Sequence, residues 1–219
     1  MVFFHKIRNP RKSKSTPAKF ASTFMCLLGG LGGAMLAQHL GTLSNEQFPG
    51  WLQTFHLDAV LTFLFPWAFA GLCIVVFSRT PLRAAINALA FFAGKLIGVY
   101  LYGAVFTHTP EWSYFSFWLV VTLLTFPLGF LFWFARGRGA VAISLSALAI
   151  GYFTLHVFNV TPTFAGFGID WSFGFIPLIL LVACIGILWR TPLQTLFSVL
   201  LGFAFAYIYV LLPFAVPLI

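Results

Sequence analysis

The charged side chains of this sequence lie almost entirely in short gaps between long apolar runs. Basic residues precede the first run and recur in three later gaps, around Arg79, Arg136 and Arg190. The acids fall in or beside the intervening gaps: Glu46, Asp58, Glu111 and Asp170. If every apolar run crosses a bilayer, the basic gaps share one face and the acids share the other. The positive-inside rule then predicts a cytoplasmic N-terminus.

The composition excludes a soluble globular protein. Apolar residues make up 61% of the chain and charged residues 7%, whereas a soluble domain carries about 25% charged residues. The net charge of +8 could suggest nucleic acid, but six of the basic residues lie within residues 1–19, directly before an apolar run. We therefore expect this basic cytoplasmic arm to contact anionic lipid headgroups, and we expect no nucleic-acid partner.

The apolar runs predict an all-α, polytopic transmembrane bundle. Because a spanning helix needs about 20 apolar residues, residues 20–219 are expected to form one transmembrane domain with seven spans. The predicted spans are 20–42, 57–78, 82–106, 114–135, 139–158, 170–189 and 192–213. Seven crossings from a cytoplasmic N-terminus place the C-terminus outside.

An internal repeat relates two pairs of these spans. Pro66 is followed thirteen residues later by Arg79 in an RTPL sequence, and Pro177 is followed at the same interval by Arg190 in another. Pro127, followed by an RGR sequence, fits the pattern more loosely. We expect one extra helix plus three helical hairpins of the same orientation. Each leading helix should be kinked at its proline, since proline removes a backbone hydrogen bond.

Lys95 is the most informative residue for function, because it lies inside the third apolar run. A charge at that depth costs about 2.5–3.5 kcal/mol or more. The side chain could pair with an acid or bind an anionic substrate, or it could extend its ammonium to the outer interface. Asn87, Gly94, Gly98 and Tyr102 fall on the same helix face, which favours the inward direction.

A second polar group is predicted on the outer face. His56 lies two residues before Asp58, and Asp170 occupies the equivalent place in the repeat. Together with Lys95, Asn87 and Tyr102, these residues are the candidates for binding a substrate or an ion. Neither metal-ligand spacing nor a catalytic motif occurs. We therefore predict no metal site, no cofactor and no enzymatic activity.

The first span carries small residues at helical spacing: Gly29, Gly30, Gly33, Ala34 and Ala37. Such faces allow two helices to approach closely. The face could pack against the chain's own hairpins, or it could form a homo-oligomer or bind a membrane partner.

Two stretches of the chain resemble a known family. Residues 77–94 (FSRTPLRAAINALAFFAG), and residues 135–139 (ARGRG) with the SLSALAIG sequence that follows at 144–151, are similar to a family of small bacterial polytopic membrane proteins with a domain of unknown function. The resemblance covers predicted spans three to five. It implies a multi-pass protein of the bacterial cytoplasmic membrane and assigns no functional residues.

Two functions remain open at this point. One is a small-solute transport or substrate-binding membrane protein with an outward-facing polar pocket, which the polar face of the third span favours. The other is a non-transporting accessory or structural subunit that assembles through the glycine-rich first helix.

Overall fold

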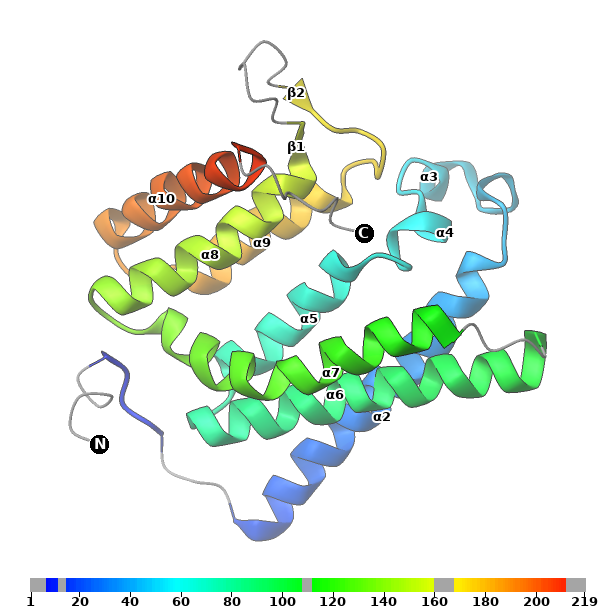
Figure 1. Cartoon of the computed structure of the whole chain (residues 1–219), viewed down its shortest axis with the longest axis horizontal. Coiled ribbons are helices and arrows are strands. Elements are labelled where there is room, and N and C mark those ends of the chain that lie inside the picture. The colour runs from blue at the N-terminus through cyan, green and yellow to red at the C-terminus, as the bar shows by residue number, and fades with distance from the viewer. Residues whose placement is uncertain (1–6, 12–14, 108–111, 160–167, 212–219) are drawn as a thin grey trace.

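The computed structural model describes residues 7–11, 15–107, 112–159 and 168–211, and in this part of the chain the fold is a helical bundle (Figure 1). The elements, in chain order, are α2 (Thr16–Gly41), η1 (Asn45–Gln47), α3 (Gly50–Gln53), α4 (Leu57–Val60), α5 (Leu64–Phe77), α6 (Pro81–Tyr102), the π-helical turn η2 (Gly103–Thr107), α7 (Trp112–Phe132), η3 (Trp133–Arg136), α8 (Ala140–Val157), β1 (Phe158–Asn159), β2 (Gly168–Ile169), α9 (Ile176–Leu188) and α10 (Pro192–Leu211).

Five of the helices are long and apolar enough to cross a membrane. They are α2, α6, α7, α8 and α10, and each coincides with a predicted span. The all-α fold of a multi-pass membrane protein is therefore confirmed by helix length and hydropathy.

The other two predicted spans contain helices shorter than expected. α5 has 14 residues and α9 has 13, so each rises only about 20 Å at 1.5 Å per residue. Pro66 and Pro177 lie in the first turns of these helices, so the predicted mid-span kink at these two residues is wrong. Proline suits a first turn, where its missing N–H leaves no helical bond unmade. Pro127, in contrast, lies inside α7 as predicted.

The basic gaps of the sequence meet at one end of the bundle. The backbone N–H of Arg11 donates to the carbonyl of Arg79 (3.0 Å), and that of Arg138 donates to the carbonyl of Ile7 (2.9 Å). The side chain of Arg190 donates to the carbonyl of Arg136 (2.7 Å). We call this the basic end. The chain leaves α2 at the end opposite the basic end, and Arg79 lies at the basic end. The segment between them, which contains α4 and α5, therefore crosses the bundle from one end to the other.

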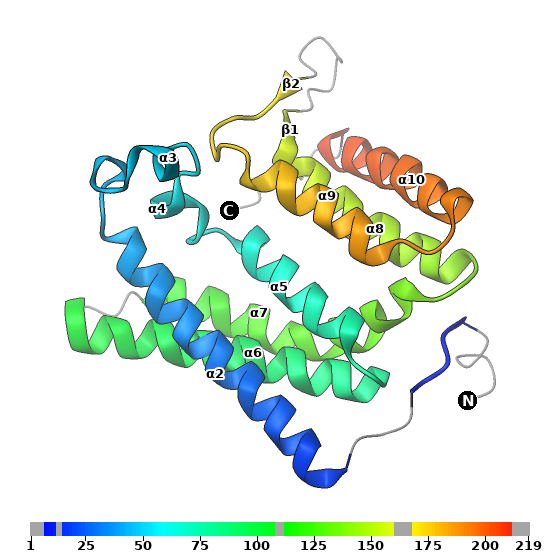
Figure 2. The same ribbon diagram turned by 180° about the vertical axis from the view of Figure 1, so that it is seen from behind.

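Two groups of helices form the bundle. α2 and α7 pack on α6, whereas α10 packs on α8 (Figures 1 and 2). Each group also contains one of the two short helices: α5 packs mainly on α6, and α9 packs mainly on α8. The α5–α6 and α9–α10 hairpins thus share their RTPL turns, as the repeat predicts, but their helices have different neighbours. The superposition of these hairpins stays a prediction.

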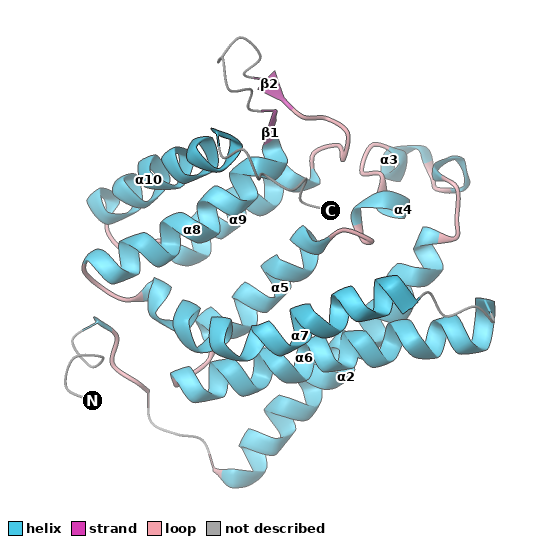
Figure 3. Ribbon diagram, in the orientation of Figure 1, coloured by secondary structure: helices cyan, strands magenta, loops and turns pink. Residues whose placement is uncertain are grey.

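One small sheet departs from the all-helical expectation. Phe158 and Asn159 pair antiparallel with Ile169 and Gly168 at the end opposite the basic end (Figure 3). The gap between the fifth and sixth predicted spans, residues 159–169, lies mostly outside the described residues. Glu111 lies outside them as well.

The sidedness of the membrane remains a prediction, and cysteine labelling can check it. The native Cys26, Cys73 and Cys184 lie within helices α2, α5 and α9. In a cysteine-free background we expect Ser172→Cys, at an exposed position of the far end, to react with an impermeant maleimide on intact cells. Thr191→Cys, exposed in the α9–α10 turn at the basic end, should react only after permeabilisation. Labelling of Thr191→Cys in intact cells would show the reverse orientation.

Candidate functional site

Lys95 is almost completely buried in α6, with 1% of its surface exposed. Its Nζ lies 2.9 Å from the centroid of the Trp118 ring, 4.6 Å from that of Trp67 and 5.7 Å from that of Tyr114. Trp67 comes from α5, and the other two rings come from α7. We call these three rings the aromatic box. The negative faces of aromatic rings attract a cation, most strongly where water is absent.

The inward direction of Lys95 that the sequence predicts is confirmed, but its surroundings differ from those expected. The neighbours that the structure places around Nζ are ring faces, whereas the sequence suggested an acid or an anionic substrate. Asp170 is tied elsewhere: its Oδ1 accepts a hydrogen bond from the backbone N–H of Ser172 (2.9 Å). Asp58 belongs to α4, and its side chain lies outside the described residues.

Asn87 lies on α6 at the contact with α2. Its Oδ1 accepts a hydrogen bond from the Thr23 hydroxyl (2.9 Å), and its Nδ2 donates to the Ser22 hydroxyl (3.4 Å). Arg83 reaches the same threonine with Nη2 (2.7 Å). These bonds join the two helices toward the basic end, so the position of Asn87 is that of a helix-pairing residue.

The remaining predicted site residues lie at the far end, in separate places. The Tyr102 hydroxyl is 3.4 Å from Nδ1 of His39, where the C-terminal ends of α2 and α6 meet. His56 precedes α4 in a left-handed backbone conformation with φ +46°. The structure thus brings Tyr102 to His39, and it does not gather Tyr102, His56 and Asp170 around one pocket with Lys95. Within the described residues, no group of three or more metal-ligating side chains comes together.

The small-residue face of the first span packs against the chain itself. A Cβ on Gly30 would fall on the carbonyl of Phe91 in α6, and one on Gly33 would lie 3.5 Å from the Trp67 ring. Ala34 and Ala37 are 1% and 5% exposed. A Cβ on Gly29 would meet nothing within 4 Å, so this residue faces away from α6.

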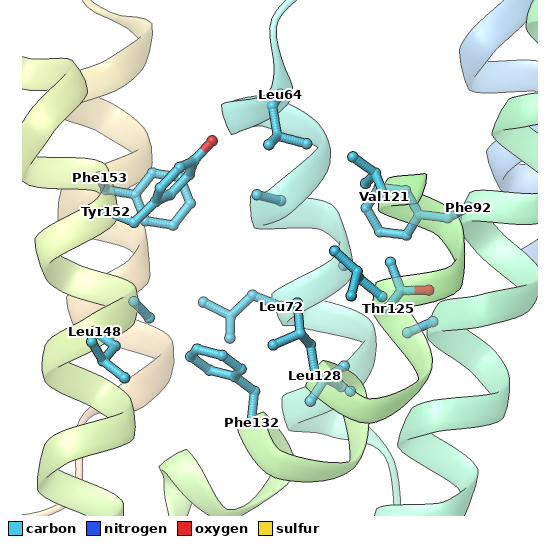
Figure 4. Close-up of a pocket in the computed structure, with 17 residues that line it drawn as sticks. Leu64, Leu72, Phe92, Val121, Thr125, Leu128, Phe132, Leu148, Tyr152 and Phe153 are labelled. Atoms are coloured by element: carbon cyan, nitrogen blue, oxygen red, sulfur yellow. The ribbon is translucent and has the colours of Figure 1, made fainter. Parts of the chain in front are cut away.

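An apolar cavity of about 370 Å³ lies between α5, α7 and α8, with α6 contributing to one wall (Figure 4). Its lining comprises Leu64, Ala68, Gly71, Leu72, Val75, Ala88, Phe92, Val121, Leu124, Thr125, Leu128, Gly129, Phe132, Leu148, Ala149, Tyr152 and Phe153. Leu124 and Leu148, on facing helices, are about half exposed, whereas Leu72 and Phe153 are buried. The cavity therefore opens sideways between α7 and α8, toward the bilayer that surrounds a membrane-spanning bundle.

Two lining residues carry polar side-chain atoms. The Thr125 hydroxyl donates to the carbonyl of Thr122 in its own helix (2.6 Å). The Tyr152 hydroxyl points away from α8, toward the Leu64 end of the cavity (Figure 4). His156, one turn further along α8, packs edge-to-face against the Tyr152 ring with 4.9 Å between ring centroids. A ligand in this cavity would thus meet apolar walls and one phenol.

Sequence reasoning missed Trp67 and Trp118. Trp67 lies near the middle of the predicted span 57–78, whereas tryptophans of membrane proteins gather at the interfaces. The depth of Trp67 was the signal available, because an indole away from the interface needs an internal partner. Trp118 lies near the start of the predicted span 114–135, where an interfacial tryptophan is ordinary. The cavity offered no such signal, since its walls have the same composition as lipid-facing surfaces.

Comparison of the chain with protein-family models, curated proteins and solved structures finds no match.

Proposed function

We propose that this chain is a substrate-binding membrane protein whose substrate is an apolar or amphipathic molecule taken up from the bilayer. The observation that carries the proposal is the cavity between α5, α7 and α8. Its volume of about 370 Å³ falls in the range of small-molecule sites. Its walls are almost entirely apolar, which suits a hydrocarbon chain and disfavours a polar solute.

This proposal keeps the substrate-binding class predicted from the sequence but changes the substrate and its entry. A polar solute would need convergent polar side chains, and the predicted ones lie at separate places in the bundle. The accessory-subunit alternative loses support because the helix face that it needs is buried within the chain. The face of α2 that contains Gly30, Ala34 and Ala37 is already covered by α5 and α6. The family resemblance and the bacterial membrane location remain part of the proposal.

Photocrosslinking can test whether a hydrocarbon chain enters the cavity. The probe is an uncharged diacylglycerol that carries a diazirine near the end of one chain. We expect crosslinks at Leu72 and Phe153, which are 8% and 2% exposed and are reached only from within the cavity. Ala68 also lines the cavity. Its replacement by phenylalanine should fill part of the cavity and reduce these crosslinks at least tenfold, since added bulk excludes a ligand of similar volume.

Two further variants keep this test decisive. Ala204→Phe makes the same change on an exposed face of α10 and should leave the crosslinks at Leu72 and Phe153 intact. Leu148→Trp narrows the exposed rim of the cavity, where it should not disturb folding, and should reduce them. Crosslinks confined to exposed residues such as Leu193 and Leu200, with no effect of either cavity variant, would contradict the proposal.

A further inference from the structure

The apolar cavity ends beneath Arg8 at the basic end. Arg8 donates from Nη1 to the carbonyl of Trp133 and from Nη2 to the carbonyl of Val76 (2.7 Å). Its guanidinium carbon lies 4.2 Å from the centroid of the Trp133 ring. Val75 and Phe132, the residues directly before Val76 and Trp133, line the cavity. The guanidinium therefore lies one residue beyond the lining of the cavity, on the side of the basic end.

Four more arginines surround this point. The hydrogen bonds of the basic end bring Arg11, Arg136, Arg138 and Arg190 together from two turns and the N-terminal segment. We call these four residues and Arg8 the arginine cluster. Burial, followed by the charges of Arg190, Arg136 and Arg11, lowers the pKa of Arg8 to about 10. Arg190 in turn lies close enough to Arg136, Arg138 and Arg11 for their positive charges to repel it.

The sequence contains no acid that could neutralise the arginine cluster locally. No Asp or Glu occurs in residues 1–45 or in residues 112–169, and the acids within the described residues, Glu46, Asp58 and Asp170, lie in η1, in α4 and directly after β2, away from the basic end. Five guanidiniums without a nearby carboxylate form a site for an anion, and guanidinium binds phosphate through paired hydrogen bonds.

We propose that an anionic phospholipid binds here, with its phosphate in the arginine cluster and one acyl chain in the cavity between α5, α7 and α8. This inference rests on the proposed function and adds the class of headgroup. The order of the two parts matches a lipid in its leaflet, with the phosphate at the membrane surface and the chain at hydrocarbon depth. A soluble phosphate would satisfy the arginines only, and it would leave the adjoining apolar walls uncovered.

The inference can be tested with the purified full-length protein in neutral detergent, by native mass spectrometry. The probes are phosphatidylglycerol, phosphatidylcholine with the same chains, and inorganic phosphate. We expect phosphatidylglycerol to bind at least fivefold more tightly than phosphatidylcholine. Arg11→Gln and Arg138→Gln should each weaken phosphatidylglycerol binding about fivefold, as expected for one basic residue at an anionic surface. Both side chains are exposed, and their recorded hydrogen bonds use backbone N–H groups, so these variants should fold.

Lys19→Gln is the matched control. It removes one positive charge from the same basic arm near the start of α2, away from the cavity, and should weaken phosphatidylglycerol binding less than either arginine variant does. Ala68→Phe should weaken both phospholipids equally, since it acts on the acyl chain.

The outcomes separate the two proposals. If Ala68→Phe weakens binding but neither arginine variant does so more than Lys19→Gln, the headgroup inference fails and the proposed function stands. If the arginine variants weaken binding and Ala68→Phe does not, the cavity holds no chain and both proposals fail. Displacement of phosphatidylglycerol by equimolar inorganic phosphate would likewise identify the ligand as a soluble anion and overturn the lipid inference.

Discussion

Replacing Gly30 by alanine is expected to destabilise the protein by about 3 kcal/mol, the upper part of the range for an overpacked contact. The added Cβ would fall on the carbonyl of Phe91 and lie 2.9 Å from the backbone nitrogen of Lys95. Both atoms belong to the α6 backbone, which cannot turn aside as a side chain can. The two helices would have to separate along their whole contact, because Gly94 and Gly98 of α6 meet the α2 backbone with similar closeness.

Gly29→Ala provides a matched control one residue away. A Cβ there meets nothing within 4 Å, and alanine is favoured over glycine in a helix by about 1 kcal/mol. We expect this variant to be as stable as the native protein or slightly more stable. Unfolding in a graded detergent titration, followed by circular dichroism, measures both. Equal stability of Gly30→Ala and Gly29→Ala would show that α2 and α6 do not meet through this face.

The second large effect concerns the aromatic box. We expect Trp118→Leu to cost about 4 kcal/mol, typical of losing a buried aromatic side chain. The ring stacks on Phe92 at 6.5 Å between centroids, and its indole N–H has no hydrogen-bond partner among the described residues. Packing and the Lys95 ammonium therefore hold Trp118 in place. Removing the ring also leaves the cation in an apolar interior without its closest neighbour.

Lys95→Met should change stability by no more than about 1 kcal/mol. Methionine keeps the unbranched stem and loses a desolvated cation–π contact of about 2 kcal/mol. It also removes a charge that costs about 2.5–3.5 kcal/mol at this depth. Since these terms nearly cancel, a structural role predicts a small net change.

A double-mutant cycle isolates the contact between the two side chains. In the Lys95→Met background, Trp118→Leu should cost about 2 kcal/mol less than in the native background, because the cation–π contact is already absent. The control cycle pairs Lys95→Met with Trp133→Leu. Trp133 is buried to the same degree, 1% exposed, but lies against Arg8. The coupling energy between Lys95 and Trp133 should be under about 0.5 kcal/mol. A coupling energy between Lys95 and Trp118 that is no larger than this would refute the contact.

The sequence by itself determined the membrane class, the positions of the long helices and the grouping of the basic turns. These properties depend on the composition of each segment, because an apolar run partitions into lipid whichever neighbours it later meets. The burial of Lys95 followed in the same way from the cost of a charge at hydrocarbon depth and from its small helical neighbours.

Only the tertiary structure decided which rings face Lys95, where α5 and α9 begin, and where the cavity lies. In water the apolar face of a helix identifies its core side, but in lipid the outer face is apolar as well, so the face of α7 that receives Lys95 is not marked in its sequence. The prolines were ambiguous because Pro66 and Pro177 suit either a kink or a first turn. The meeting of Arg8 with Trp133 required the N-terminal segment to fold back on the bundle, a contact across 125 residues of chain that no local pattern records.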